Sequence, residues 1–73
     1  MTKYIIYAED DKRPGKQVQI RKAKREYEAL DFVTDMKNLA KYGCMTLVMD
    51  ADGKEFVWDE ETRSWLPSGV GGD

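Results

Sequence analysis

The feature that most constrains this chain is a single stretch, residues 24–42, in which apolar side chains recur at helical spacing. The intervals are three or four residues, the spacing that places side chains on one face of a helix. The positions are Ala29, Leu30, Phe32, Val33, Met36, Leu39 and Ala40. Gly43 follows directly and suits the left-handed conformation that often ends a helix. We therefore expect one helix, which must bury its apolar face against other elements.

Strand-forming segments lie on both sides of the expected helix. Residues 3–9 are rich in β-branched and aromatic side chains, and residues 17–21 alternate polar and apolar ones. The two are predicted to form a hairpin across a charged Pro-Gly loop. Three further strands are expected at residues 44–50, 54–59 and 64–67. Asp52 and Gly53 suit the tight turn between the first two of these, and Pro67 suits a strand edge or end.

This order of elements, β-β-α-β-β-β, predicts an α+β fold in which one helix packs on a small, mostly antiparallel sheet. The chain is 73 residues long, so we expect a single domain with a small core. We place that domain at residues 1–67 and expect the glycine-rich residues 68–73 to form a flexible C-terminal tail. In the third strand, Met45, Leu47 and Met49 are expected to share one face.

Composition argues against several classes of function. One cysteine allows no internal disulfide, and the absence of histidine removes the commonest acid–base catalyst and zinc ligand. Cys44 follows a helix end, which disfavours a thiolate, so we expect a buried structural cysteine. We expect no enzymatic activity, no cofactor and no metal. The longest apolar run, residues 4–8, is too short for a membrane span, and a cytoplasmic location is expected.

Charge is distributed unevenly, although the net charge is only −2. Residues 1–25 hold eight Lys or Arg and three acids, whereas residues 26–73 hold four and eleven. Seven of the basic residues are candidates for one basic patch that attracts phosphates or an acidic protein surface. They are Lys12, Arg13, Lys16, Arg21, Lys22, Lys24 and Arg25. The alternatives are an ordinary solvated face and, less favoured by the pI of about 5.1, a nucleic-acid interface.

The eight aromatic residues exceed what one short helix can cover, so some are expected at the surface. Tyr7 and Trp58 are the candidate aromatic anchors for a protein partner. Tyr4 and Tyr7 are three residues apart on one strand, so their side chains should point to opposite faces. This pair therefore does not predict the aromatic platform on which RNA-binding modules stack bases.

The order of several short segments adds a family resemblance. The segments are Lys3-Tyr4-Ile5-Ile6, a charged loop, Gln17-Val18-Gln19-Ile20, one helix, a strand with Cys44, Asp52-Gly53 and Arg63-x-Trp65. This pattern resembles small phage-encoded anti-CRISPR proteins, those that inhibit type I-F systems in particular. The resemblance implies a non-enzymatic inhibitor that docks on a surveillance complex and occludes or alters its nucleic-acid-binding surface. It implies that the basic patch makes the contacts, whereas the acidic C-terminal half suits a basic groove on the partner, and both options stay open.

Two functions are therefore expected, in this order. The first is a phage or mobile-element protein that binds and inhibits a host protein complex, such as a CRISPR–Cas effector, in the host cytoplasm. The alternative is a small module that acts directly on RNA or DNA, whose affinity for oligonucleotides should fall steeply with salt. A homodimer through the open sheet face or an edge strand is a further possible assembly, and no membrane partner is expected.

Overall fold

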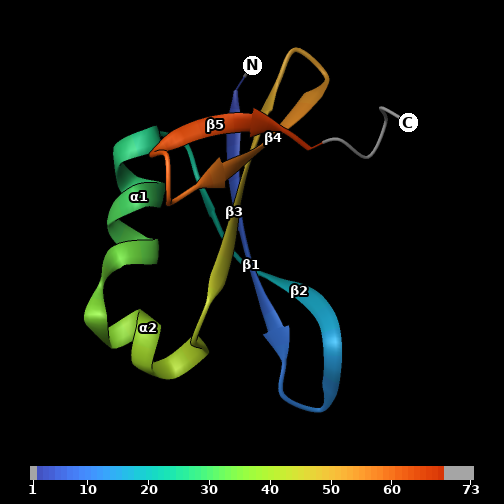
Figure 1. Ribbon diagram of the computed structural model, residues 1–73, viewed down its shortest axis with the longest axis vertical. Helices are drawn as coiled ribbons and strands as arrows, with labels where there is room; N and C mark the ends of the chain where they lie inside the picture. Colours follow the sequence, from blue (N-terminus) through green and yellow to red (C-terminus); the bar gives the residue numbers. More distant parts are fainter. Residues whose placement is uncertain (1, 69–73) are drawn as a thin grey trace.

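The computed structural model describes residues 2–68 as a five-stranded sheet with two short helices on one of its faces (Figure 1). In chain order the elements are β1 (Lys3–Asp10), β2 (Arg13–Ala23), α1 (Glu26–Thr34), α2 (Met36–Tyr42), β3 (Met45–Ala51), β4 (Lys54–Asp59) and β5 (Ser64–Pro67). The strands lie in the order β2-β1-β3-β4-β5, and every neighbouring pair is antiparallel. The predicted α+β class and the strand order along the chain are confirmed.

The prediction of one continuous helix is wrong, because the chain breaks at Asp35. Asp35 has an extended backbone (φ −67°, ψ 127°), and its carboxylate accepts a hydrogen bond from the Lys37 N–H at 2.8 Å. It is thus the N-cap of α2. Just before it, the Thr34 hydroxyl bonds the Leu30 carbonyl at 2.8 Å, a contact that tends to bend helices. The break leaves Met36 83% exposed, although its spacing predicts a buried position.

The core lies between α1 and the two strands β1 and β3. Ile6, Ala29 and Leu47 form a buried cluster, and Ala8 is buried two residues further along β1. Partly buried side chains surround this cluster: Tyr4, Ile20, Ala23, Leu30, Phe32, Val33, Met45, Trp58 and Trp65. Ile6 and Leu47 are direct cross-strand partners, so Ala29 of α1 packs over one pair and joins the two layers. The predicted shared face of Met45 and Leu47 is confirmed.

The strand β2 is longer than the predicted residues 17–21, because it also includes Pro14 and Gly15, the latter with a positive φ of 90°. The Gly15 N–H donates to the Glu9 carboxylate at 2.6 Å, which holds the far end of the hairpin. Two register shifts interrupt the β1–β2 pairing. Between Ile6 and Tyr7, strand β2 has one extra residue, Ile20, which is a β-bulge that increases the local twist, and between Glu9 and Asp10 it has the three extra residues 14–16. The result is an 11-residue edge strand that runs along the whole of β1.

The turns of the second half of the chain follow the sequence closely. Asp52 and Gly53 both have positive φ, 54° and 78°, the combination that a type I′ hairpin turn requires. Pro67 ends β5, which is an edge strand, as predicted. The predicted tail, residues 68–73, lies outside the described residues except for Ser68, whose N–H donates to the Glu55 carbonyl at 3.1 Å.

Candidate interaction surfaces

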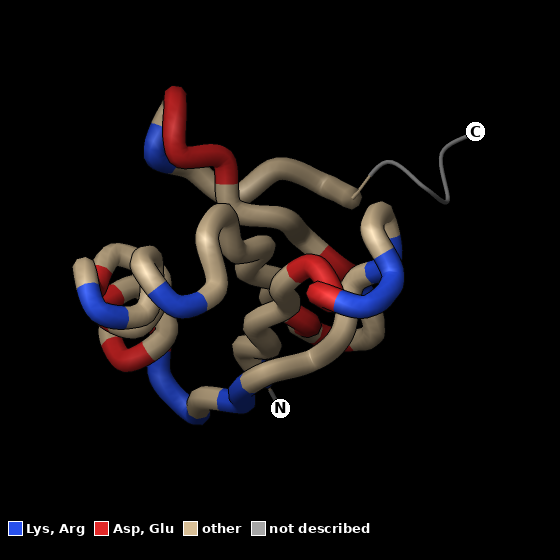
Figure 2. The backbone as a smooth tube through the Cα atoms, turned by 90° about the horizontal axis from the view of Figure 1, so that it is seen from below, with Lys and Arg blue, Asp and Glu red and all other residues tan. Residues whose placement is uncertain are grey.

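The seven residues of the basic patch are all exposed, but the structure places them in groups along β2 (Figure 2). Lys12, Arg13 and Lys16 lie at the β1–β2 hairpin, and Arg21, Lys22, Lys24 and Arg25 lie towards α1. Arg13 lies opposite Asp10 and Lys22 lies opposite Ile5, and these β1 partners are five residues apart, which corresponds to roughly 17 Å at about 3.3 Å per residue. Because of this separation the two groups form two local surfaces.

At the hairpin, acids compensate the basic residues. The Arg13 Nε lies 3.7 Å from the Asp10 Oδ2, and Asp10 also accepts a hydrogen bond from the Lys12 N–H at 3.1 Å. Residues 9–16 hold three acids and three basic residues, so the formal charge of this turn is zero. This end of β2 therefore contributes little to the long-range attraction of an acidic partner.

The junction between β2 and α1 is the stronger cationic surface. Lys22 and Lys24 line one shallow hollow together with Lys3, which starts the neighbouring strand β1. Arg25 follows immediately and precedes α1. We call these four exposed residues, Lys3, Lys22, Lys24 and Arg25, the junction cluster.

Two residues at this surface, Lys3 and Tyr27, were not predicted from the sequence. Lys3 joins the cluster because β1 and β2 pair antiparallel, with Ile5 opposite Lys22, which brings the start of β1 beside the end of β2. The antiparallel hairpin predicted from the sequence already implied that Lys3 lies near the end of β2. Tyr27 lies next to the cluster, is 57% exposed, and accepts a hydrogen bond from the Arg25 guanidinium at 3.2 Å. Tyr and Arg are the residue types enriched at the energetic centres of protein interfaces.

Arg21 belongs to a different environment. Its Cζ lies 5.1 Å from the centroid of the Phe32 ring, a cation–π contact on the helix side of the sheet. The hollow around it is also lined by Glu28, Asp31 and Asp35. Lys22, the next residue, is paired with Ile5 and so projects from the opposite face. Arg21 therefore helps to fix α1 on the sheet among acidic neighbours.

The two candidate aromatic anchors lie on opposite faces of the sheet. Trp58 is half-buried on the helix side, where its ring meets Trp65 edge-to-face at 5.2 Å between centroids. Tyr7 is half-buried on the helix-free face, opposite Thr46 of β3. Tyr4 packs against Trp65 at 5.9 Å on the helix side, so the predicted opposite orientation of Tyr4 and Tyr7 is confirmed.

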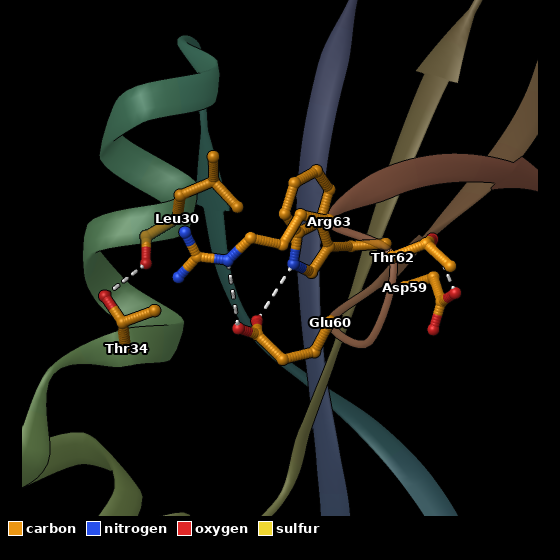
Figure 3. Close-up of polar contacts among 7 residues, drawn as sticks. Leu30, Thr34, Asp59, Glu60, Thr62 and Arg63 are labelled. Atoms are coloured by element: carbon orange, nitrogen blue, oxygen red, sulfur yellow. Dashed lines mark hydrogen bonds and ion pairs between the residues drawn. The ribbon is translucent and has the colours of Figure 1, made fainter.

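The turn between β4 and β5 holds Trp58 in place (Figure 3). The Trp58 indole N–H donates to a Glu60 carboxylate oxygen at 3.1 Å, and the other oxygen of Glu60 lies 3.9 Å from the Arg63 Nε. The Thr62 hydroxyl donates to Asp59 at 2.7 Å and closes the turn. A hollow between this turn and α1 is lined by Leu30, Thr34, Trp58, Glu60 and Arg63. This hollow thus combines the Trp58 side chain with the charged groups of Glu60 and Arg63.

Cys44 is exposed, so the prediction of a buried structural cysteine is wrong. The strand β3 begins one residue later, at Met45, and Cys44 belongs to the short link that follows α2. Gly43 precedes it with a φ of 75° and donates its N–H to the Leu39 carbonyl at 2.8 Å. The predicted helix end at Gly43 is therefore confirmed, but the link keeps the thiol at the surface.

Comparison of the chain with protein-family models, curated proteins and solved structures found no match. No helix within residues 2–68 is long and apolar enough to cross a membrane. The class that the fold defines is a small α+β domain with one helix-covered and one helix-free sheet face. The exposed surfaces of this domain are therefore the features that indicate a function.

Proposed function

We propose that this chain is a small binding protein that inhibits a host protein complex. Because the sequence resembles anti-CRISPR proteins, the first target to test is a type I-F surveillance complex. The observation that carries the proposal is the junction cluster, where Lys3, Lys22, Lys24 and Arg25 lie exposed at one end of the edge strand beside the exposed Tyr27. This combination suits an acidic protein surface.

The physical roles of these groups differ. Exposed cations accelerate the encounter with an acidic surface and fix its orientation, but they add little affinity by themselves. Affinity comes from an aromatic or Arg side chain that loses its water in the interface, which is the role we propose for Tyr27 and Arg25. The free side of β2 also offers unpaired N–H and C=O groups to a partner strand.

The proposed mechanism is occlusion. A standard interface buries roughly 800 Å² on each partner, about a seventh of the 5667 Å² surface of this chain. The remainder of the molecule projects from the interface and excludes other ligands from the neighbouring surface of the target. A chain docked beside a nucleic-acid-binding groove would thus block DNA by its bulk, with no chemical step.

The first test is capture of partners from host lysate with the tagged chain, with and without nuclease. A stoichiometric protein complex that survives nuclease is expected. Loss of every partner on nuclease treatment would overturn the proposal in favour of the alternative, direct binding to RNA or DNA. In cells with an active type I-F system, expression of the chain should restore plating of a targeted phage; unchanged plating would remove that target.

A matched pair of variants tests the surface. Lys24→Glu/Arg25→Glu reverses two cations of the junction cluster, and Lys37→Glu/Lys54→Glu reverses two exposed cations elsewhere with the same change in net charge. The first variant should lose at least tenfold in affinity for the captured complex, and the control should change it less than threefold. Equal effects would show that the junction cluster is an ordinary solvated edge.

A further inference from the structure

The helix-free face of the sheet carries a continuous apolar row. Ile5, Val48, Val57 and Leu66 are successive cross-strand partners on β1, β3, β4 and β5. Directly paired residues share a face, so the four side chains form one line across four strands. Leu66 is 46% exposed and the other three are half-buried, while both helices lie on the other side of the sheet (Figure 1). Within the described residues this row has no covering layer.

Polar residues flank the apolar row in a pattern that differs between two strands. On β1, Lys3 and Tyr7 lie two residues either side of Ile5 and share its face. On β4, Glu55 and Asp59 lie two residues either side of Val57 in the same way. Register aligns the rows, because Lys3 pairs with Asp50 and Asp50 pairs with Glu55. One side of the face therefore presents a cation and a phenol, and the other presents two carboxylates.

We infer that this face binds a second copy of the same chain, about a two-fold axis that runs along β3. Such an axis places β1 of each copy over β4 of the other, since these strands lie on either side of β3. Lys3 then lies over Glu55 of the second copy, and Tyr7 lies over its Asp59. The apolar rows meet between them, with Ile5 over Val57, and Lys22, which lies opposite Ile5 on the edge strand β2, lies over Leu66 of the second copy. Lys3 and Lys22 also belong to the junction cluster, so the dimer and an acidic partner would compete for these two side chains. A cation thus faces an anion and a phenol faces a carboxylate, twice in each dimer.

The direction of the axis follows from charge. An axis across the strands would place Glu55 over Asp59 of the second copy and leave Lys3 over Tyr7. An axis along β3 avoids that repulsion. Asp50, the charged residue of β3, then lies over Asp50 of the second copy, and each Asp50 has its cross-strand partner Lys3 beside it. Aligned sheets pack about 10 Å apart, with an angle of roughly −30° between their strand directions. At this angle, near the centre of the interface, β1 of each copy stays close to β4 of the other.

The dimensions also suit a second copy. A standard interface buries roughly 800 Å² on each partner, about a seventh of the 5667 Å² surface of this chain. Only four hydrophobic side chains within residues 2–68 are fully buried, and all belong to the helix-covered side or its helix. Chains below about 80 residues often add stability by oligomerisation, and a second copy would give the helix-free face its covering layer.

Sedimentation equilibrium of the full chain tests the inference over a range of concentrations. The expected species at high concentration has twice the mass of the 8.4 kDa chain. Val57→Glu puts a charge at the centre of the apolar row and should weaken the dimer at least tenfold, with circular dichroism as the check on folding. Met36→Glu, at an 83% exposed position on α2, is the control and should change the dimer less than threefold.

Two variants at exposed positions provide a test that does not depend on the core. Lys3→Glu or Glu55→Lys alone should weaken the homodimer, because each creates like charges across the interface. A mixture of the two variants should restore a dimer, because every Lys3–Glu55 contact between unlike copies then joins opposite charges. A monomer at all concentrations would overturn the inference, and so would a dimer that neither the Val57→Glu substitution nor the mixture affects.

Discussion

The two faces of the sheet are built from the same strands but have different roles. Ile6 is fully buried under α1, whereas its neighbour Ile5 is half-buried on the face without helices. The same alternation separates Trp65 from Leu66 on β5. The difference shows that hydrophobicity alone did not select the core: both faces carry apolar rows, and the position of the helices decides which row is buried.

Replacing the two adjacent isoleucines with alanine should give the largest difference between the faces. Ile6→Ala should lower the free energy of unfolding by about 3 kcal/mol, because it leaves a cavity beneath Ala29. Ile5→Ala should lower it by about 1 kcal/mol, since that side chain keeps contact with water. Urea denaturation followed by circular dichroism, at concentrations where the chain is monomeric, measures both. Equal losses would contradict the assignment of the core to one face.

The second comparison uses the neighbouring pair on β5. The Trp65 indole N–H donates to the Glu26 carboxylate and so links the last strand to α1. Trp65→Phe should cost about 1–2 kcal/mol through this bond and the contact with Trp58. Leu66→Ala should cost less than about 1 kcal/mol in the monomer. A double-mutant cycle checks the cause: Glu26→Ala should add little in the Trp65→Phe background.

A smaller effect is expected where the helical cover breaks. Asp35→Ala removes the side-chain cap of α2 and should cost about 1 kcal/mol of stability. Asp31→Ala is the control, because Asp31 lies exposed within α1 and should change stability by less than about 0.5 kcal/mol. Thermal unfolding of both variants makes the comparison. If the two variants unfold alike, the carboxylate of Asp35 does not determine the break.

The smallest effect is expected at Cys44. Because the thiol is exposed, Cys44→Ser should change stability by less than about 0.5 kcal/mol. In the folded chain the thiol should react with DTNB nearly as fast as it does in urea. A slow reaction in the folded chain, or a loss well above that value, would place the cysteine in the core after all.

The local pattern of the sequence predicted much of this fold. Alternation marked the strands, Asp52 and Gly53 marked a hairpin turn, and Gly43 marked the helix end, because each signal depends on near neighbours in the chain. The break at Asp35 was missed, since the apolar spacing continues across it. Only the Asp35 side chain, a strong N-cap type, could have indicated a second helix.

The candidate surfaces were predicted less completely. The sequence identified an excess of basic residues in its first 25 positions, but not their division along β2 or their compensation at the hairpin. Strand pairing brings Lys3 into the junction cluster, and the position of α1 places Tyr27 beside it. The structure also showed that Arg21 and Lys22, adjacent in the chain, lie on opposite faces.

The sequence by itself determined the α+β class, the strands and turns, and which residues share a face, because these follow from contacts within a few residues. The tertiary structure alone decided which face the helices cover, where the positive charge gathers, and that Cys44 lies at the surface. Those properties depend on residues far apart in the chain that meet only when the sheet is assembled and the helices pack on it.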